Sequence, residues 1–468
     1  MTALITRFAP SPTGNLHLGG ARTALINYVI SKKNSDSKFY LRIEDTDKVR
    51  SKEIYTKNII DSLTWLGLEW DSEAQIQSSR IEKHKKIADN LLNNNFAYKC
   101  ICDEKTLLTK REQIIKSKLK LKKICTECKD NKNIQELSSN YAVRLKIPIE
   151  GKTTIKDTVQ GNITINNQEL DDYIILRKDG SPTYMLSVVV DDHDLGINYI
   201  IRGNDHFNNS FRQIYIYKFM NWQTPNYAHI PLIHGEDGAK LSKRHGAINV
   251  MELMNQGYLP DSIINNLILL GWAPKNNNSE IIKIKEIINT FNINEISKSS
   301  SIFNYDKLNY FNNYYLRLDE NLKNFKIFCK NNEILNSLYN QDEEKLLRIF
   351  QVYKKNLNFY TELFKFTNIY FERDYTINIK DEIFGEVFNK NIKDFVENIK
   401  NLDSWSVELL ENFISTYLKD KQIKFPIFGK PMRYILTKSY QGPSVSDILF
   451  ILGKKDSLER LNQYITNI

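Results

Sequence analysis

Two hydrophobic rhythms alternate along the first 250 residues of the chain. Short apolar runs predict strands, and apolar positions three or four residues apart predict helices. The strand pattern occurs at residues 3–5, 38–43, 197–201 and 227–233. The helix pattern begins after residue 20 and recurs at about 59–66, 79–92 and 206–220. This alternation is typical of a doubly wound, Rossmann-like α/β fold with a parallel sheet.

The pattern changes in residues 98–180, where four cysteines, a lysine-rich stretch and several short strand-like runs occur together. A turn at Asp179 and Gly180 then leads back to the earlier rhythm. We therefore interpret residues 98–180 as an inserted α/β domain. It separates residues 1–97 from residues 181–246, which we expect to be the two halves of one catalytic nucleotide-binding fold.

Beyond residue 246 the helical rhythm continues almost to the end of the chain, and strand alternation is scarce. Apolar residues at helical spacing occur, for example, at Leu346, Ile349, Phe350 and Tyr353. We expect a helical domain over residues 247–318 and an all-α C-terminal region over residues 319–468.

Composition narrows the class of protein. A chain of 468 residues is too long for one core, and a hydrophobic content of 41% is that of a globular protein. The formal net charge of +9 suits a polyanionic partner, although compositional drift toward lysine would also produce it. No apolar run reaches the roughly 20 residues of a membrane span. The chemistry-bearing residues begin at Arg7, which leaves no room for a leader segment, so we expect a cytoplasmic protein without membrane contact.

Residues 7–20 read RFAPSPTGNLHLGG and combine a strand end, a Gly-rich turn and the start of a helix. The first N–H groups of a helix lack partners within it and carry the positive end of its dipole, so this arrangement suits a phosphate. Gly19 and Gly20 permit close approach to the backbone, and His17 adds a side-chain donor. The alternative for His17 is an imidazole that only caps its own helix.

A second stretch, Lys240-Leu241-Ser242-Lys243-Arg244, places three cations around a serine and is flanked by glycines. Such a loop suits a polyphosphate anion that is held transiently. A basic pentapeptide by itself is usually a solvated loop, so its meaning depends on the first stretch.

Together, the two stretches resemble the signature motifs of class I aminoacyl-tRNA synthetases. The full first stretch resembles specifically that of the bacterial-type glutamyl-tRNA synthetases. The resemblance implies ATP-dependent ligation of L-glutamate to tRNA(Glu) through a glutamyl-adenylate, with acyl transfer to the 3′-terminal adenosine. It also implies Mg²⁺ with the ATP and a monomer, and it leaves open whether tRNA(Gln) is charged too. Residues 98–180 would bind the acceptor stem, 247–318 would contact the stem and 319–468 would bind the anticodon.

The resemblance also assigns roles to individual residues. The catalytic groups would be His17, Lys240 and Lys243. ATP would be bound by His17, Gly19, Gly20, Lys243 and Arg244. Glutamate would be bound by Arg7, Ala9, Ser11, Glu44, Tyr184 and Arg202.

The residue types agree with those roles, because a glutamate pocket needs cations for two carboxylates and an anion for the α-ammonium. Arg7 and Arg202 follow strands and can hold carboxylates, and Glu44 can hold the ammonium. The alternatives are an ordinary surface pair for Arg7 and Glu44, and a packed core residue for Tyr184.

Four cysteines form two close pairs in the inserted segment, Cys100 with Cys102 and Cys125 with Cys128. Four thiolates suit a tetrahedral, structural Zn²⁺, and reduced free thiols are the alternative. The fifth, Cys329, stands alone among helical residues and is expected to be buried.

Three rival functions remain for such a chain. A shortened relative that glutamylates queuosine on a tRNA lacks an anticodon-binding region, which the long helical tail argues against. A glutaminyl relative has a β-barrel in that region, which helical periodicity disfavours. A non-catalytic RNA-binding paralogue is disfavoured because His17, Lys240 and Lys243 are intact.

Overall fold

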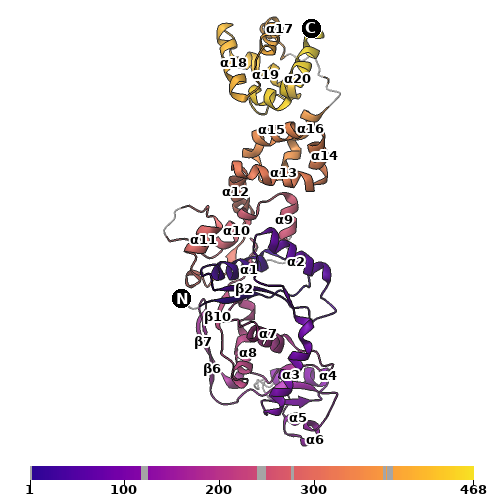
Figure 1. Cartoon of the computed structure of the whole chain (residues 1–468), viewed down its shortest axis with the longest axis vertical. Coiled ribbons are helices and arrows are strands. Elements are labelled where there is room, and N and C mark those ends of the chain that lie inside the picture. The colour runs from indigo at the N-terminus through magenta and orange to yellow at the C-terminus, as the bar shows by residue number, and fades with distance from the viewer. Residues whose placement is uncertain (1–2, 117–124, 240–248, 276–278, 373–375, 377–382) are drawn as a thin grey trace. The chain divides into compact units, whose positions relative to one another are not determined.

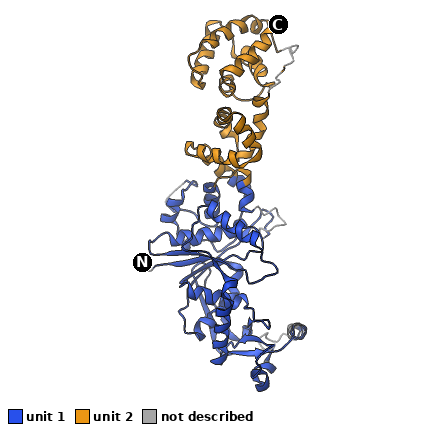
Figure 2. Ribbon diagram, turned by 45° about the vertical axis from the view of Figure 1, so that its right-hand side comes forward, with its two compact units in different colours: residues 1–254, 260–308 blue, residues 255–259, 309–468 orange. Residues whose placement is uncertain are grey.

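A computed structural model describes residues 3–116, 125–239, 249–275, 279–372, 376 and 383–468 (Figure 1). The chain divides into two compact units (Figure 2). One contains Met1–Met254 and Pro260–Leu308, and the other contains Asn255–Leu259 and Asn309–Ile468. The predicted loop residues Lys240, Lys243 and Arg244 lie outside the described residues.

The first half of the catalytic fold is a parallel sheet built from β1 (Ile5–Phe8), β2 (Lys38–Ile43) and β3 (Gln75–Ile76). The helices α1 (Leu18–Ser31) and α2 (Glu53–Trp65) make the two connections. Parallel neighbours need such crossovers, so strand and helix alternate as the hydrophobic rhythm predicts.

The second half continues the sheet on the other side of β1. β9 (Tyr199–Gly203) and β10 (Asn226–Ile230) are parallel, and the Asn198 backbone N–H donates to the Ile5 carbonyl at 3.2 Å. Because β2 and β9 lie on opposite sides of β1, the strand order reverses there. Ligands of doubly wound sheets bind at the carboxyl ends of strands where this reversal occurs. The doubly wound prediction is confirmed, and the reversal lies between β1 and β9.

One hairpin departs from the predicted organisation. β6 (Lys152–Asp157) pairs with β7 (Gly161–Asn166) and runs parallel to β10, so both strands extend the catalytic sheet (Figure 1). The rest of the segment forms a separate sheet of β4 (Ala97–Cys100), β5 (Ala142–Leu145) and β8 (Ile174–Leu176). Residues 98–180 therefore do not form one inserted domain. The sequence did not predict this, because alternating apolar residues in a strand do not reveal which sheet the strand joins.

A shared core joins these parts. Buried residues of β5, β6 and β8 pack with those of α3 (Ile81–Asn93), α7 (Tyr184–Asp194) and α8 (Phe207–Phe219). The helices α10 (Pro260–Leu269) and α11 (Ile284–Thr290) belong to the same compact unit. Beyond residue 316, the described residues contain helices and no strand.

The C-terminal helices confirm the predicted all-α region. Their bounds are α13 (Leu322–Asn331), α14 (Glu333–Gln341), α15 (Glu343–Tyr353), α16 (Phe364–Phe371), α17 (Glu386–Lys400), α18 (Val407–Asp420), α19 (Phe425–Thr437) and α20 (Val445–Thr466). Cys329 is buried in α13, as expected. None of the helices in the described part of the chain is long and apolar enough to cross a membrane.

Candidate active site

A cavity of about 380 Å³ lies where the sheet reverses, at the carboxyl ends of β1 and β9. Its lining comes from the turn after β1, the tip of α1, the end of β2, the start of α7 and the end of β9. All the sequence-predicted ATP and glutamate residues that the structure describes line this one cavity: Arg7, Ala9, Ser11, His17, Gly19, Gly20, Glu44, Tyr184 and Arg202.

His17 is the N-cap of α1, and its Nδ1 accepts a hydrogen bond from the Gly20 backbone N–H at 3.1 Å. Because Nδ1 is the acceptor, the proton of the neutral imidazole is on Nε2, which is a donor. The capping interpretation of His17 is therefore correct. It is also compatible with a ligand-binding role, since the cap fixes the ring and its tautomer at the cavity.

Gly19 and Gly20 are required for space. A Cβ on Gly19 would lie 3.1 Å from His17 Nδ1, and a Cβ on Gly20 would lie 2.9 Å from Leu16 Cδ1. Larger residues would displace either the imidazole or the turn before it. The absence of a Cβ at both glycines thus leaves room for the His17 cap at the helix tip.

The described residues on both sides of the basic loop lie at this cavity. On the N-terminal side, Pro231, Leu232 and Ile233 line it. On the C-terminal side, Asn249 forms a β-bridge with His17, and the Val250 backbone N–H donates to the Leu16 carbonyl at 3.0 Å. The described residues that flank positions 240–248 therefore lie at the cavity on one side and at the helix tip on the other.

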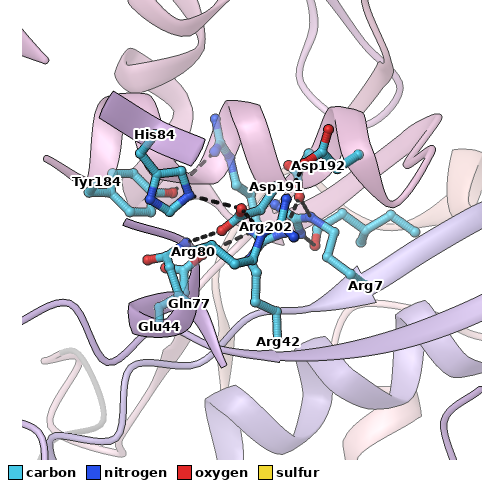
Figure 3. Close-up of polar contacts among 12 residues, drawn as sticks. Arg7, Arg42, Glu44, Gln77, Arg80, His84, Tyr184, Asp191, Asp192 and Arg202 are labelled. Carbon is cyan, nitrogen blue, oxygen red and sulfur yellow. Dashed lines mark hydrogen bonds and ion pairs between the residues drawn. The ribbon is translucent and has the colours of Figure 1, made fainter. Parts of the chain in front are cut away.

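Below the cavity, four side chains form a set that we term the paired cluster: Arg7, Arg42, Glu44 and Asp192 (Figure 3). Asp192 Oδ1 accepts from Arg7 Nε at 3.0 Å and from Arg42 Nη1 at 2.6 Å. Arg42 Nη2 donates to Glu44 Oε1 at 3.0 Å. All four are buried, so the interpretation of Arg7 and Glu44 as a surface pair is wrong.

Sequence reasoning missed Arg42 and Asp192. Their signal was an arginine inside the apolar run of β2, and an acidic pair, Asp191 and Asp192, directly after the apolar residues 188–190. Asp191 is also bound, since it accepts from Gln77 and Arg80 and contacts His84 (Figure 3).

The two carboxylates of the paired cluster differ in protonation behaviour. Burial would raise the pKa of Asp192, but Arg42 and Arg7 together hold it below its ordinary value. At Glu44 burial prevails over the contact with Arg42 and raises the pKa. Asp192 is therefore the firmly ionised partner of the two arginines.

On the other side of the cavity floor, the partners of Arg202 among the described residues are all uncharged groups. Its Nε donates to His229 at 3.0 Å and its Nη1 to the Tyr184 hydroxyl at 3.2 Å, whereas Nη2 donates to Ser210, Gln213 and the His206 carbonyl. We term Arg202, Tyr184, Ser210 and Gln213 the open cluster.

Arg202 is 5% exposed, yet no carboxylate of the described residues forms an ion pair with it. A buried cation without an acidic partner is costly unless a ligand supplies the anion. Burial raises the pKa of Tyr184, which keeps its hydroxyl proton available as a second donor. This half of the floor is therefore suited to an incoming carboxylate.

The four predicted cysteine ligands lie together. Their Sγ atoms are all within 4.8 Å of one another, with 3.2 Å between Cys100 and Cys125 and 3.6 Å between Cys102 and Cys128. Hydrogen bonds from Cys125 and from Arg144 Nε lower the pKa of Cys100 to about 4, although burial opposes this. A Zn–S length of about 2.3 Å in a tetrahedron requires sulfur separations of roughly 3.8 Å, so these residues could hold Zn²⁺ after small shifts.

Comparison with known proteins defines the class. A family model described as the catalytic domain of class I tRNA synthetases (E and Q) matches residues 3–310, and one described as an anticodon binding domain matches residues 317–465. The chain thus carries both the catalytic and the anticodon-binding part of a class I synthetase, as the resemblance predicted.

Individual relatives of the chain are glutamate–tRNA ligases. Glutamate–tRNA ligase 2 of Rickettsia akari is 40% identical over 98% of this chain and 99% of its own length. Glutamate–tRNA ligase 1 of Ehrlichia canis is 40% identical over 98% of both chains. A crystal structure of a glutamate tRNA ligase from Elizabethkingia meningosepticum, in complex with its amino acid, superimposes with a TM-score of 0.83, 27% identity and 99% coverage of both chains. The chain belongs to the glutamate–tRNA ligase family.

Proposed function

We propose that this chain uses ATP to ligate L-glutamate to tRNA(Glu), through a glutamyl-adenylate and acyl transfer to the 3′-terminal adenosine. The observation that carries the proposal is the single cavity. At one end a capped helix tip suits phosphate, and at the other a buried guanidinium has no carboxylate partner within the described residues. The rival function that lacks an anticodon-binding region, glutamylation of queuosine on a tRNA, disagrees with the match to residues 317–465.

At the amino-acid end, Arg202 Nη1 and the Tyr184 hydroxyl form a pair of donors for the side-chain carboxylate of glutamate. Glu44 contacts Arg42 through Oε1, which leaves Oε2 to accept from the α-ammonium. Arg7 supplies positive charge beside them, and Ala9 and Ser11 line the same wall.

At the phosphate end, Nε2–H of His17 and the first N–H groups of α1 stabilise negative charge on the α-phosphate. Lys240 and Lys243 would stabilise the departing pyrophosphate, and Arg244 would hold the nucleotide. Bound with ATP, Mg²⁺ would neutralise part of the phosphate charge. This chemistry depends on positioning and electrostatic stabilisation and needs no protein nucleophile.

Charging of tRNA(Glu) with labelled glutamate tests the proposal. The unaltered chain should transfer label in an ATP-dependent manner, and the His17→Asn variant should lose about 10²–10³-fold in kcat, as expected for one lost donor. Lys48→Gln changes a charge away from the cavity lining and serves as the control. Absence of glutamate charging by the folded, unaltered chain would refute the proposed function.

For the cysteines, we propose a structural Zn²⁺ held by Cys100, Cys102, Cys125 and Cys128. Four thiolates leave no open coordination position, so the metal would stabilise the fold around β4 without entering the reaction. Elemental analysis of chelator-washed protein should find one zinc per chain, and Cys125→Ser should lose it. Zinc-free, fully folded protein would leave only reduced thiols at this place.

For tRNA binding, we propose that the segment around β4, β5 and β8 binds the acceptor end and that residues 247–318 contact the stem. Residues 319–468 would read the anticodon. The chain would bind tRNA as a monomer. Because tRNA charging serves translation, we propose that it occurs in the cytoplasm. Parallel charging of tRNA(Glu) and tRNA(Gln) tests whether anticodon reading is relaxed. Label on tRNA(Gln) would establish relaxed specificity, and its absence would restrict the enzyme to tRNA(Glu).

A further inference from the structure

Behind the open cluster, two more buried residues continue the contacts of Arg202 across the sheet. His229 on β10 is in register with Arg202 on β9, and its Nε2 accepts from Arg202 Nε at 3.0 Å. The other ring nitrogen, Nδ1, lies 2.6 Å from Asp157 Oδ2 at the end of β6. His229 is fully buried and Asp157 is 5% exposed.

The chemistry of the three groups fixes the proton on His229. A guanidinium can only donate, so the Nε2 atom that faces Arg202 must be a bare acceptor. The imidazole proton is therefore on Nδ1 and is donated to the Asp157 carboxylate. A protonated imidazole would direct an N–H at the N–H of Arg202, so the contact requires a neutral His229.

Asp157 is itself held rigidly. Its Oδ1 accepts from the backbone N–H groups of Val159 at 3.0 Å and Gln160 at 2.8 Å, and its Oδ2 accepts from the backbone N–H of His229 at 3.0 Å. In return, Gln160 Nε2 donates to the His229 carbonyl at 2.8 Å. The carboxylate thus clamps β10 at the position of His229 and orients its ring.

In this arrangement one side chain, the imidazole of His229, separates the Asp157 carboxylate from the Arg202 guanidinium. A carboxylate in direct contact with Arg202 would neutralise it and compete with a ligand. Here the direct partners of Arg202 are neutral, and the nearest hydrogen-bonded anion acts through an imidazole. The contact of Arg202 Nε with His229 thereby orients the guanidinium, while Nη1 faces Tyr184 at the cavity.

We propose that Asp157 and His229 form a positioning couple that aims Arg202 at the glutamate carboxylate, and so contributes to the preference for glutamate over glutamine. The inference rests on the proposed glutamate-charging function. It concerns residues that do not line the cavity and act only through Arg202. The hairpin of β6 and β7 consequently contributes to the amino-acid site, although it lies within the segment between the two halves of the fold.

The test uses two amides that mimic different ring nitrogens. In His229→Gln, the amide oxygen reaches the place of Nε2 and can accept from Arg202. In His229→Asn, the shorter amide can satisfy Asp157 but does not reach Arg202. We expect the asparagine variant to raise the KM for glutamate about tenfold or more, with the KM for ATP within about twofold of the unaltered value. The glutamine variant should restore most of the loss.

The control is His84→Asn, which alters another fully buried His–Asp pair, with Asp191 at 2.9 Å, that is not in contact with Arg202. It should lower stability without changing the KM for glutamate. If His229→Asn fails to fold, Asp157→Asn provides the same readout, because it leaves Arg202 and His229 in place and removes the anion that fixes the tautomer.

The outcomes separate the two proposals. If the unaltered chain does not charge tRNA(Glu) with glutamate, the proposed function fails. If it does, the positioning couple is refuted by an unchanged glutamate KM in the asparagine variant, by an equal rise in the ATP KM, or by absence of rescue with glutamine. A selective rise in the glutamate KM together with rescue supports it.

Discussion

The paired cluster and the open cluster lie under one cavity, and they treat their arginines in opposite ways. In the paired cluster, Arg7 and Arg42 are bound directly by Asp192 and Glu44, so buried charge is balanced within the protein. In the open cluster, the direct partners that the described part of the chain offers Arg202 are all neutral. We propose from this difference that Arg42 and Asp192 of the paired cluster maintain the fold, whereas Arg202 of the open cluster receives an anion from a ligand.

The largest expected effect concerns the paired cluster. Arg42→Met would leave Asp192 and Glu44 buried with less compensation, which should lower the free energy of unfolding by about 3–5 kcal/mol. Urea denaturation measures this. The matched control is Arg50→Met, because Arg50 pairs with Asp47 on the surface at 2.7 Å and should matter by less than about 1 kcal/mol. Equal stability of the two variants would contradict a structural role for Arg42.

The next effect concerns the open cluster, where we expect a substitution to lower activity more than stability. Arg202→Gln removes a buried cation without orphaning an acidic partner, so only hydrogen bonds to neutral groups are lost. The free energy of unfolding should therefore fall less than in Arg42→Met, by about 1–3 kcal/mol. Activity should suffer instead, with kcat/KM for glutamate lower by about 10- to 100-fold. Aminoacylation kinetics and urea denaturation on the same preparation check both parts. Loss of the fold would show that Arg202 is structural like Arg42.

A smaller effect is expected at the phosphate end of the cavity, where a helix cap, and not an ion pair, holds the site in shape. Gly20→Ala brings a Cβ to 2.9 Å from Leu16 Cδ1, and overpacking of this kind costs about 1–3 kcal/mol. The displaced cap should also slow ATP–pyrophosphate exchange. Gly385→Ala is the control, since its Cβ would meet no atom within 4 Å. Identical behaviour of the two variants would exclude a steric role for Gly20.

The smallest effect is the response to acid. Burial acts to raise the pKa values of Asp191 and Asp192, but both are lowered in the folded protein. At Asp191 the contacts with His84, Arg42 and Arg80 together outweigh burial, and at Asp192 those with Arg42 and Arg7 do. The unfolded chain therefore binds protons first as the pH falls through the ordinary value of 3.8, and stability declines by about 1 kcal/mol per pH unit for each group. The raised pKa of Glu44 offsets part of this decline.

Denaturation curves at pH 7, 4 and 3 measure the acid response. Arg202→Gln should show the same dependence, because Arg202 forms no ion pair with a carboxylate of the described residues. Constant stability down to pH 3 would contradict the ion pairing of the paired cluster.

The sequence predicted those features that depend on local pattern. Hydrophobic rhythm located β1, β2, α8 and the helical C-terminal region, and the Gly-rich turn located the helix tip of His17. Cysteine spacing located a cluster whose sulfur atoms do lie together. Each of these signals is contained within a few residues, which is why a single sequence sufficed.

Features that depend on long-range pairing were not predictable in this way. The hairpin of β6 and β7 joins β10 through contacts over about seventy positions, which alternation within a strand does not encode. Arg42 and Asp192 are 150 positions apart, and each reads as an ordinary charged residue by itself. The same holds for Asp157 and His229, whose joint role depends on their register with Arg202.

The most direct test of the account is the ratio of kcat/KM for glutamate to that for glutamine, measured on tRNA(Glu) with the unaltered chain and with Arg202→Gln. Glutamine has an uncharged amide in place of the side-chain carboxylate, so it gains little from the guanidinium. We expect the ratio to fall by about 10- to 100-fold in the variant. An unchanged ratio would contradict the claim that the open cluster receives the side-chain carboxylate of the substrate.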